Sequence, residues 1–202
     1  SNGHCRGGYK WGKVYGGGWH RGTLYAMPNN GIPLVKGKVL QTITTHKNYE
    51  LSFNIRPTSK LRGWSSVIHF TKGPSNNSRI PAIWFFSGTT RMHVRQGRPG
   101  SSNDGCDTSA QLPLNRWSKV TVRLSGSDLT VLVNDKTWCK NSRYKNAQAG
   151  TTGVRVYAGD PWHGVASARI KDFEYEKLKA PKKTHWVQKP EFKLKKSYMF
   201  HG

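Results

Sequence analysis

Short runs of alternating hydrophobic and polar residues fill the middle of the chain. In Tyr49–Arg56, Leu51, Phe53 and Ile55 fall on one face and polar residues on the other. This period of two is typical of a half-buried strand, and Pro57 ends it. The same pattern predicts further strands at Ser66–Thr71, Ala82–Ser87, Arg91–Gln96, Ser118–Leu124, Leu129–Asn134, Gly153–Tyr157 and Arg169–Tyr175.

Loops rich in Gly, Ser, Asn, Asp and Pro separate these runs. The segment Ser125-Gly126-Ser127-Asp128, for example, is typical of a hairpin turn between two strands. No stretch shows a helical period with caps, and no repeat of fixed length is present. Many short strands at this spacing predict an all-β sandwich or barrel.

The two ends of the chain have a different composition. Residues 1–38 combine many glycines with interleaved aromatic and basic residues, without a period of 2 or 3.6. We therefore predict an extended aromatic-basic arm at 1–38, a single sandwich at 39–178 and a basic tail at 179–202. A chain of 202 residues has the length of one all-β domain with a substantial core.

The chain is strongly basic along its whole length. Lys and Arg number 33 against 10 Asp and Glu, which gives a net charge of +23. Residues 1–38 hold six basic and no acidic residues, 39–176 hold nineteen against nine, and 177–202 hold eight against one. A surplus spread in this way predicts a broad electrostatic surface and a polyanionic partner.

Features of the chain indicate a secreted, processed product. The sequence opens Ser1-Asn2-Gly3 without Met and has neither a membrane-spanning apolar run nor a signal-like stretch. The segment Asn76-Asn77-Ser78 is an N-glycosylation acceptor, and chance explains such a triplet equally well. We expect a secreted protein without a membrane anchor.

Cys5, Cys106 and Cys139 lack the C-x-x-C spacing of a zinc site. One disulfide with a third thiol left over is the simplest expectation. A Cys106–Cys139 bond would close a loop of about thirty residues, worth roughly 3–4 kcal/mol in the chain-entropy model. Alternatively, Cys5 joins two chains, and the sequence does not decide the pairing.

Three parts of the chain together resemble the concanavalin A-like lectin/laminin-G superfamily of secreted animal proteins. They are Trp64–Thr71 with Arg79–Phe85, then Leu112–Val120, and finally Val154–Trp162 leading to Ile170–Tyr175. The resemblance covers residues 45–178 and implies a jelly-roll sandwich of two antiparallel sheets. Because the superfamily includes lectins, matrix adhesion modules, glycosidases and lyases, it implies a fold and not one function.

A predicted strand carries a row of cationic side chains. In Arg91–Arg95, strict alternation directs Met92 and Val94 to the core and places Arg91, His93 and Arg95 on one outer face. Their spacing of roughly 7 Å matches successive sulfates or carboxylates on a sugar chain. The competing interpretation is a solvated face without a specific ligand.

Further residues complete the predicted polyanion site. Lys119 and Arg123 share a second outward row, and Arg155 points outward from a third strand. If these strands are neighbours, the sheet presents a basic face, to which we add Arg79. Trp162, in a loop after Asp-Pro, is either an exposed sugar contact or a structural anchor.

The sequence does not favour catalysis, and we predict no catalytic residue, metal or cofactor. The strand-borne acids lack the arrangement of paired carboxylates that glycosidases use; they are Glu50, Asp172, Glu174 and Glu176. A polysaccharide lyase needs Arg or Asn beside a uronate carboxylate and Tyr, His or Lys for proton transfer. These residue types are present at His69, Arg79, Arg95, Tyr144 and Lys145.

The sequence thus predicts a secreted, non-catalytic, lectin-like or extracellular-matrix protein that binds acidic or sulfated polysaccharide such as heparin. One alternative is a self-assembling structural or adhesive protein whose arms clasp adjacent copies into oligomers or filaments. The other alternative is a lyase acting on a uronic-acid polymer. Nucleic acid ranks last, because basic charge with interleaved aromatics suits single strands but no nucleic-acid-binding fold is recognised.

Overall fold

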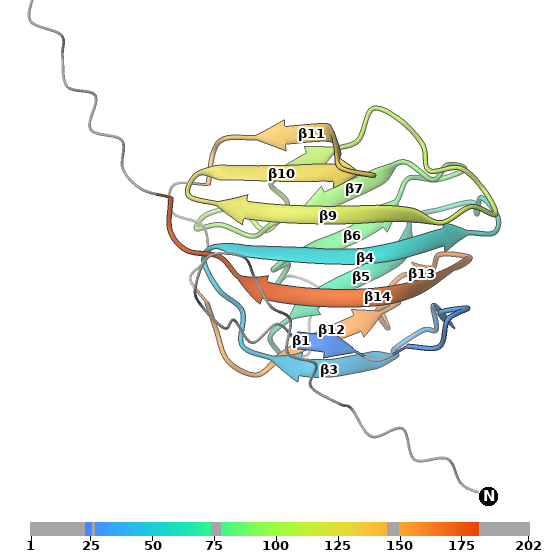
Figure 1. The fold of residues 1–202 in the computed structure, drawn as a ribbon, viewed down its shortest axis with the longest axis horizontal. Coiled ribbons are helices and arrows are strands. Elements are labelled where there is room, and N and C mark those ends of the chain that lie inside the picture. Colours follow the sequence, from blue (N-terminus) through green and yellow to red (C-terminus); the bar gives the residue numbers. More distant parts are fainter. Residues whose placement is uncertain (1–22, 26, 74–77, 145–149, 182–202) are drawn as a thin grey trace, which may run out of the picture.

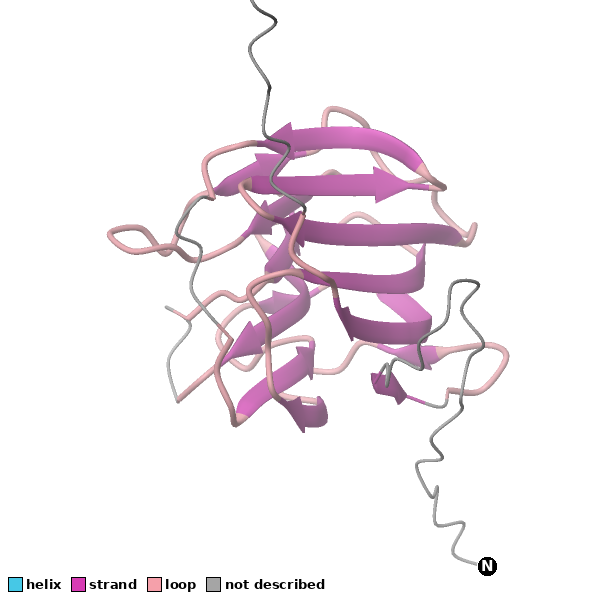
Figure 2. Ribbon diagram, turned by 60° about the vertical axis from the view of Figure 1, so that its left-hand side comes forward, coloured by secondary structure: helices cyan, strands magenta, loops and turns pink. Residues whose placement is uncertain are grey.

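The computed structural model describes residues 23–25, 27–73, 78–144 and 150–181. All regular secondary structure in these ranges is β-strand, as Figure 2 shows. Within the same ranges, no helix has the length and apolar character needed to span a bilayer. Cys5, Asn76, Lys145 and most of the two predicted arms lie outside the described residues.

Two stacked sheets form the domain (Figure 1). Sheet A, in front in Figure 1, has the order β1 (Thr23–Tyr25), β14 (Ala168–Lys177), β4 (Tyr49–Pro57), β9 (Ser118–Ser125), β10 (Asp128–Val133) and β11 (Lys136–Asn141), with β2 (Ile32–Pro33) also paired to β14. Sheet B, behind it, has the order β3 (Val39–Ile43), β12 (Val154–Ala158), β5 (Ser65–Thr71), β6 (Ala82–Phe85), β7 (Met92–Arg95) and β8 (Gly105–Asp107).

The pairings in both sheets are antiparallel except for the short strand β13 (Gly164–Val165), which runs parallel to β5. The predicted jelly-roll sandwich of two antiparallel sheets is confirmed. The predicted strands are present, with ends that shift by a residue or more. Sequence analysis missed the short edge strands, because β3, β8 and β11 have mixed faces that give little alternation.

Alternating burial builds the core between the sheets. Along β4, Leu51, Phe53 and Ile55 are at most 1% exposed, while the residues between them are half-buried. Strand β5 differs, because every one of its residues is buried. A strand buried on both faces must be covered on its outer side as well, so sheet B carries a second layer of side chains outside the core.

Part of the segment assigned to the N-terminal arm packs on the sandwich. The amide of Leu34 donates to the carbonyl of Ala168 at 3.0 Å, and that of Val35 donates to Ala158 at 3.1 Å. Leu34 is 8% exposed and belongs to the core. The domain therefore begins before residue 39, because this segment satisfies its backbone hydrogen bonds on both sheets.

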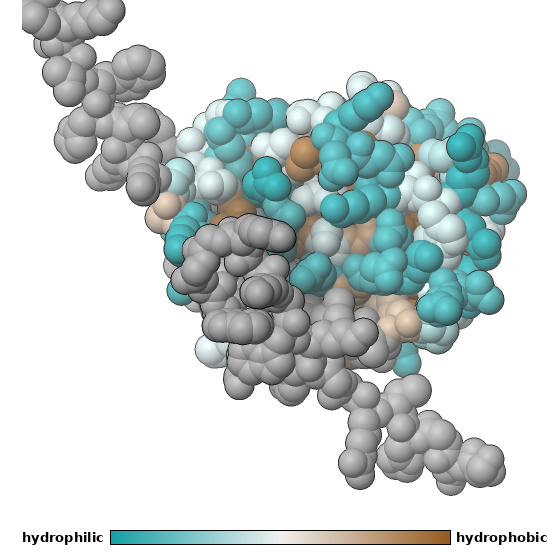
Figure 3. All heavy atoms as spheres, viewed as in Figure 1, coloured by the Kyte–Doolittle hydropathy of each residue, from teal (hydrophilic) through white to brown (hydrophobic). Residues whose placement is uncertain are grey.

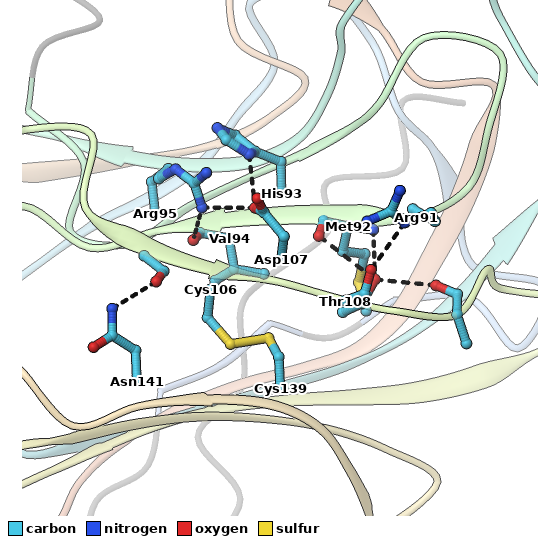
Figure 4. The surroundings of a disulfide bond; sticks show 12 residues. Arg91, Met92, His93, Val94, Arg95, Cys106, Asp107, Thr108, Cys139 and Asn141 are labelled. Atoms are coloured by element: carbon cyan, nitrogen blue, oxygen red, sulfur yellow. Dashed lines mark hydrogen bonds and ion pairs between the residues drawn. A yellow bond between two sulfur atoms is a disulfide. The ribbon is translucent and has the colours of Figure 1, made fainter.

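A disulfide joins Cys106 of β8 to Cys139 of β11 (Figure 4). Because β8 is an edge of sheet B and β11 an edge of sheet A, the bond fastens the two sheets along one side. This pairing, which the sequence left undecided, closes a loop with a sequence separation of 33.

Replacing both cysteines by Ala should lower the free energy of unfolding by about 3–4 kcal/mol, because the unfolded chain regains the entropy of the open loop. Urea unfolding of the C106A/C139A variant and of the oxidised wild type measures the loss. The reduced wild type should match the variant. An unchanged urea midpoint would show that the crosslink contributes nothing to stability.

Candidate functional site

The outer face of sheet B brings aromatic, basic and acidic side chains into register. Trp84 of β6 pairs with His93 of β7, and His93 pairs with Asp107 of β8. Further along the same face, His69 of β5 pairs with Tyr157 of β12. Because directly opposed residues point to the same face, these side chains form a continuous layer over the sheet.

A pocket of about 280 Å³ opens in this layer, lined by Trp64, Arg79, Trp84, His93, Asn103 and His163. The Trp64 side chain, 45% exposed, stands 4.7 Å from the His93 ring between centroids. Trp84 is only 3% exposed and lies beneath the polar residues. The pocket thus has the exposed Trp64 ring at its mouth and the buried Trp84 indole at its floor.

The buried carboxylate of Asp160 lies beneath the pocket and accepts hydrogen bonds from two of its lining residues, Trp84 and His163. It accepts hydrogen bonds from the Trp84 indole at 3.2 Å and from Nδ1 of His69 and of His163 at 3.0 Å each. The backbone amides of Trp162 and His163 also donate to it, at 3.0 and 2.8 Å. Burial opposes ionisation, but the hydrogen bonds from His69 and His163 hold the pKa of Asp160 well below its usual range.

His69 bridges two acceptors. Its Nδ1 faces the Asp160 carboxylate, and its Nε2 lies 2.9 Å from the carbonyl oxygen of Ser78. A carbonyl and a carboxylate can only accept, so both contacts are hydrogen bonds when the ring carries both protons. His69 and Asp160 thus form a buried hydrogen-bonded pair, with both side chains fully enclosed.

The loop that presents Asp160 is fixed by its own backbone. Gly159 has φ of +92°, and a Cβ there would lie 2.8 Å from the carbonyl oxygen of Val35. The Asp160 amide donates to Oγ of Ser66 at 3.0 Å. Only glycine combines this conformation with so close an approach, which locks the start of the loop against sheet B.

Two histidines of the pocket share the same arrangement. Nδ1 of His163 contacts Asp160, and Nδ1 of His93 lies 2.8 Å from Oδ1 of Asp107 (Figure 4). Burial and the nearby Arg95 lower the pKa of His93 to about 4, although Asp107 acts in the opposite direction. His93 is therefore neutral at pH 7. Among the described residues, Nε2 of neither histidine has a hydrogen-bond partner.

The predicted row on β7 lies on one outer face but is not a row of free cations. Arg95 is 8% exposed and donates to Asp107 at 2.8 Å. Arg91 donates to the carbonyl of Thr108 at 2.9 Å and lies over a neighbouring aromatic ring. The prediction was wrong on this point, because β8 places a carboxylate and a carbonyl beside the row.

Of the other predicted residues, Arg79 lines the pocket, Trp162 precedes the pocket residue His163, and Arg155 lies on β12, which β5 separates from β6. The Arg79 guanidinium is 5.1 Å from the centroid of Trp84, and its Nη1 donates to Asn103. Trp162 is half-buried and packs edge-on against the His69 ring at 5.5 Å, as a loop anchor does. Arg155 donates to the carbonyl of Gly73 at 2.6 Å and is held by the fold.

Lys119 and Arg123 lie on the opposite side of the molecule. Both are on β9 of sheet A, where Arg123 pairs with Glu50 at 2.5 Å and Lys119 with Asp135 at 3.6 Å. These residues would share a basic face with the β7 row only if their strands were neighbours, and this condition is not met, because β9 and β7 belong to different sheets. Figure 3 looks onto sheet A, and its visible surface is largely hydrophilic.

The residues suggested for a lyase do not come together as a set. His69 is buried beneath the pocket, and Tyr144 is buried in the core. Sequence reasoning also missed Asn103, Asp160 and His163. The spacing Asp-x-x-His, with a Gly before it, was an available signal, since it suits a carboxylate that accepts hydrogen bonds from the following turn. No group of three or more potential metal ligands occurs among the described residues.

No protein-family model matches this chain, and no curated protein matches it in sequence. Solved structures do resemble it. They include the botulinum neurotoxin serotype D binding domain, with a TM-score of 0.54 and 12% identity over 79% of this chain and 44% of that one. A Trypanosoma rangeli sialidase mutant displaying trans-sialidase activity has a TM-score of 0.53 and 11% identity, over 79% of this chain and 28% of that one.

The binding domain of Paraclostridial Mosquitocidal Protein 1 gives a TM-score of 0.52 and 14% identity, over 68% of this chain and 36% of that one. This chain thus spans less than half the length of each of these three proteins. Likenesses at such low identity establish the fold alone, a jelly-roll β-sandwich of two sheets, and do not single out laminin-G modules.

Replacing Asp160 by Asn should destabilise the domain by about 1–3 kcal/mol, because an amide cannot accept all the hydrogen bonds that His69, Trp84 and His163 give to the buried carboxylate. Urea unfolding measures the effect. The D135N variant is the matched control: the Asp135 side chain is 80% exposed, so its loss should change little. Equal stability of D160N and D135N would contradict the role given to the buried pair.

Acid should weaken the fold through His93. Its pKa falls from 6.5 in the unfolded chain to about 4 in the folded one. Between these values only the unfolded chain binds the proton, so stability present above pH 6.5 is lost as the pH falls toward 4. Melting temperatures near pH 7.5 and near pH 5 test this.

The H93N variant, whose amide can still donate to Asp107, should show a smaller difference between the two pH values. His46, whose pKa is also lowered, is present in both proteins and does not affect the comparison. The same loss in wild type and variant would assign the pH dependence to other groups.

Proposed function

We propose that this domain is lectin-like and binds an acidic carbohydrate in the pocket on the outer face of sheet B. The observation that carries this proposal is the exposed Trp64 indole standing with the Arg79 guanidinium around a single pocket of about 280 Å³. An aromatic ring offers a flat apolar surface to the apolar face of a sugar ring, and Arg offers a planar fork to a carboxylate or sulfate.

The remaining pocket residues suit the hydroxyl groups of a sugar. Neutral His93 donates through Nδ1 to Asp107, which leaves Nε2 as an acceptor. The Asn103 amide accepts from Arg79 and retains its own NH₂ donors. A small pocket with a few placed polar groups is the usual form of a specific ligand site.

The charge around the pocket favours an anion. The two nearby carboxylates are already engaged, Asp160 by the buried pair with His69 and Asp107 by His93 and Arg95. Burial and the charge of Arg95 lower the pKa of Arg79 and Asp160 opposes this, so an anionic ligand between the two arginines reduces their repulsion. The net charge of +23 adds long-range attraction.

Two further observations support the wider proposal. A protein of similar fold is named as a sialidase, which agrees with a carbohydrate partner in general. The Cys106–Cys139 disulfide agrees with an extracellular location, since such bonds persist in oxidising compartments. Self-assembly through the terminal arms stays a prediction, because those residues lie outside the described ranges.

Binding to size-matched heparin, chondroitin sulfate, hyaluronan, alginate and a neutral glucan at physiological salt tests the proposal. We expect selective binding to one acidic glycan. Replacing Arg79 by Gln should weaken it roughly tenfold or more, because a charge-assisted hydrogen bond is lost. Replacing Trp64 by Ala should weaken it as well.

The matched control is the K119Q/R123Q variant, which removes two cations from sheet A and leaves the pocket intact. A salt-sensitive loss that is equal in R79Q and K119Q/R123Q would show binding by overall charge and would reject a defined pocket.

A further inference from the structure

The pocket contains more than a binding site requires. Two imidazoles line it, and each donates Nδ1–H to a carboxylate, His163 to Asp160 and His93 to Asp107. This contact fixes the tautomer and orientation of each ring and leaves Nε2 to meet a ligand. A histidine oriented by a carboxylate is the common form of a general base.

We propose that the pocket cleaves a uronic-acid polysaccharide by β-elimination, with Nε2 of His163 as the base. This inference rests on the proposed function, since the polymer must first bind there. Arg79 and Asn103 would hold the uronate carboxylate, His163 would remove the proton next to it, and Trp64 would support the sugar ring at the mouth of the pocket.

Elimination suits the residues better than hydrolysis does. Hydrolysis of a glycosidic bond generally uses two carboxyl groups that flank it. None of the described residues that line the pocket is Asp or Glu. The strand-borne acids Glu50, Glu174 and Glu176 lie on sheet A, on the far side of the core. Elimination needs no carboxylate pair, only a base and a cation for the substrate carboxylate.

The steps balance without an oxidant or a cofactor. His163 Nε2 takes the proton from C5, and its electron pair forms the C4–C5 double bond as the bond from C4 to the leaving oxygen breaks. The leaving oxygen takes a proton from water, and the hydroxide that results accepts the proton held by His163. Pairing with Arg79 and Asn103 stabilises the negative charge that develops on the carboxylate.

The two histidines have different roles. The pKa of His93 is about 4, too low for an efficient base at neutral pH, so His93 accepts a hydrogen bond from a sugar hydroxyl. His163 is held by both oxygens of the Asp160 carboxylate at 3.0 Å each and packs edge-on against Trp84, 5.4 Å between centroids. The Arg79 guanidinium lies 5.1 Å from the centroid of the same Trp84 ring, so the proposed base His163 and the cation Arg79 both contact the Trp84 indole.

The test follows ultraviolet absorbance of the unsaturated uronate while the full chain is incubated with hyaluronan, alginate, chondroitin sulfate and polygalacturonate in turn. We expect one polymer to give rising absorbance. The H163N variant keeps an amide donor for Asp160 but lacks Nε2, so it should bind that polymer as before and lose product formation by roughly 100-fold or more. The H46N variant, altered outside the pocket, should retain full activity.

The outcomes separate the two proposals. Binding with flat absorbance for all four polymers would overturn the elimination and leave the binding function intact. Neither binding nor absorbance would overturn both. If H163N forms product at the wild-type rate, His163 is not the base. Melting temperatures of the variants establish that each is folded, and an H163N variant that binds normally without product supports the assignment.

Discussion

The candidate site depends on one buried carboxylate. Asp160 lies outside the core yet is fully enclosed, and five donors to its carboxylate come from the Trp84 indole, the buried His69 and the loop that follows it. A charge buried in this way persists only if donors surround it, so each of those groups is held in place by the need to satisfy it. The shape of the pocket follows from that requirement.

The sandwich supplies the positions from which these donors converge. Strands β5, β6 and β7 are adjacent, and their outward residues fall into register across sheet B. The burial of every residue of β5 is the structural sign of this second layer. The inner face of the same strands packs against sheet A, so the rigidity of the core extends directly to the pocket.

Much of the fold could be predicted from the sequence, because alternation along β4 or β9 reports directly on a half-buried face. The site could not, because it depends on which strands become neighbours. Arg91, His93 and Arg95 share a face as their spacing requires, but nothing in their own segment shows that Asp107 lies opposite. Likewise Lys119 was grouped with them although the chain places it on the other sheet. Asp160 resembled an ordinary turn residue, since its partners come from distant segments.

The disulfide has a consequence beyond stability. Cys106 precedes Asp107, the residue that orients His93, and the crosslink anchors the edge strand carrying both (Figure 4). Strand β8, which carries Asp107 beside the pocket residue His93, is thus crosslinked by a bond that forms under oxidising conditions. In a chain whose thiols are reduced, β8 and its Asp107 contact to His93 are held only by non-covalent pairing with β7 and its neighbours, without the crosslink to sheet A.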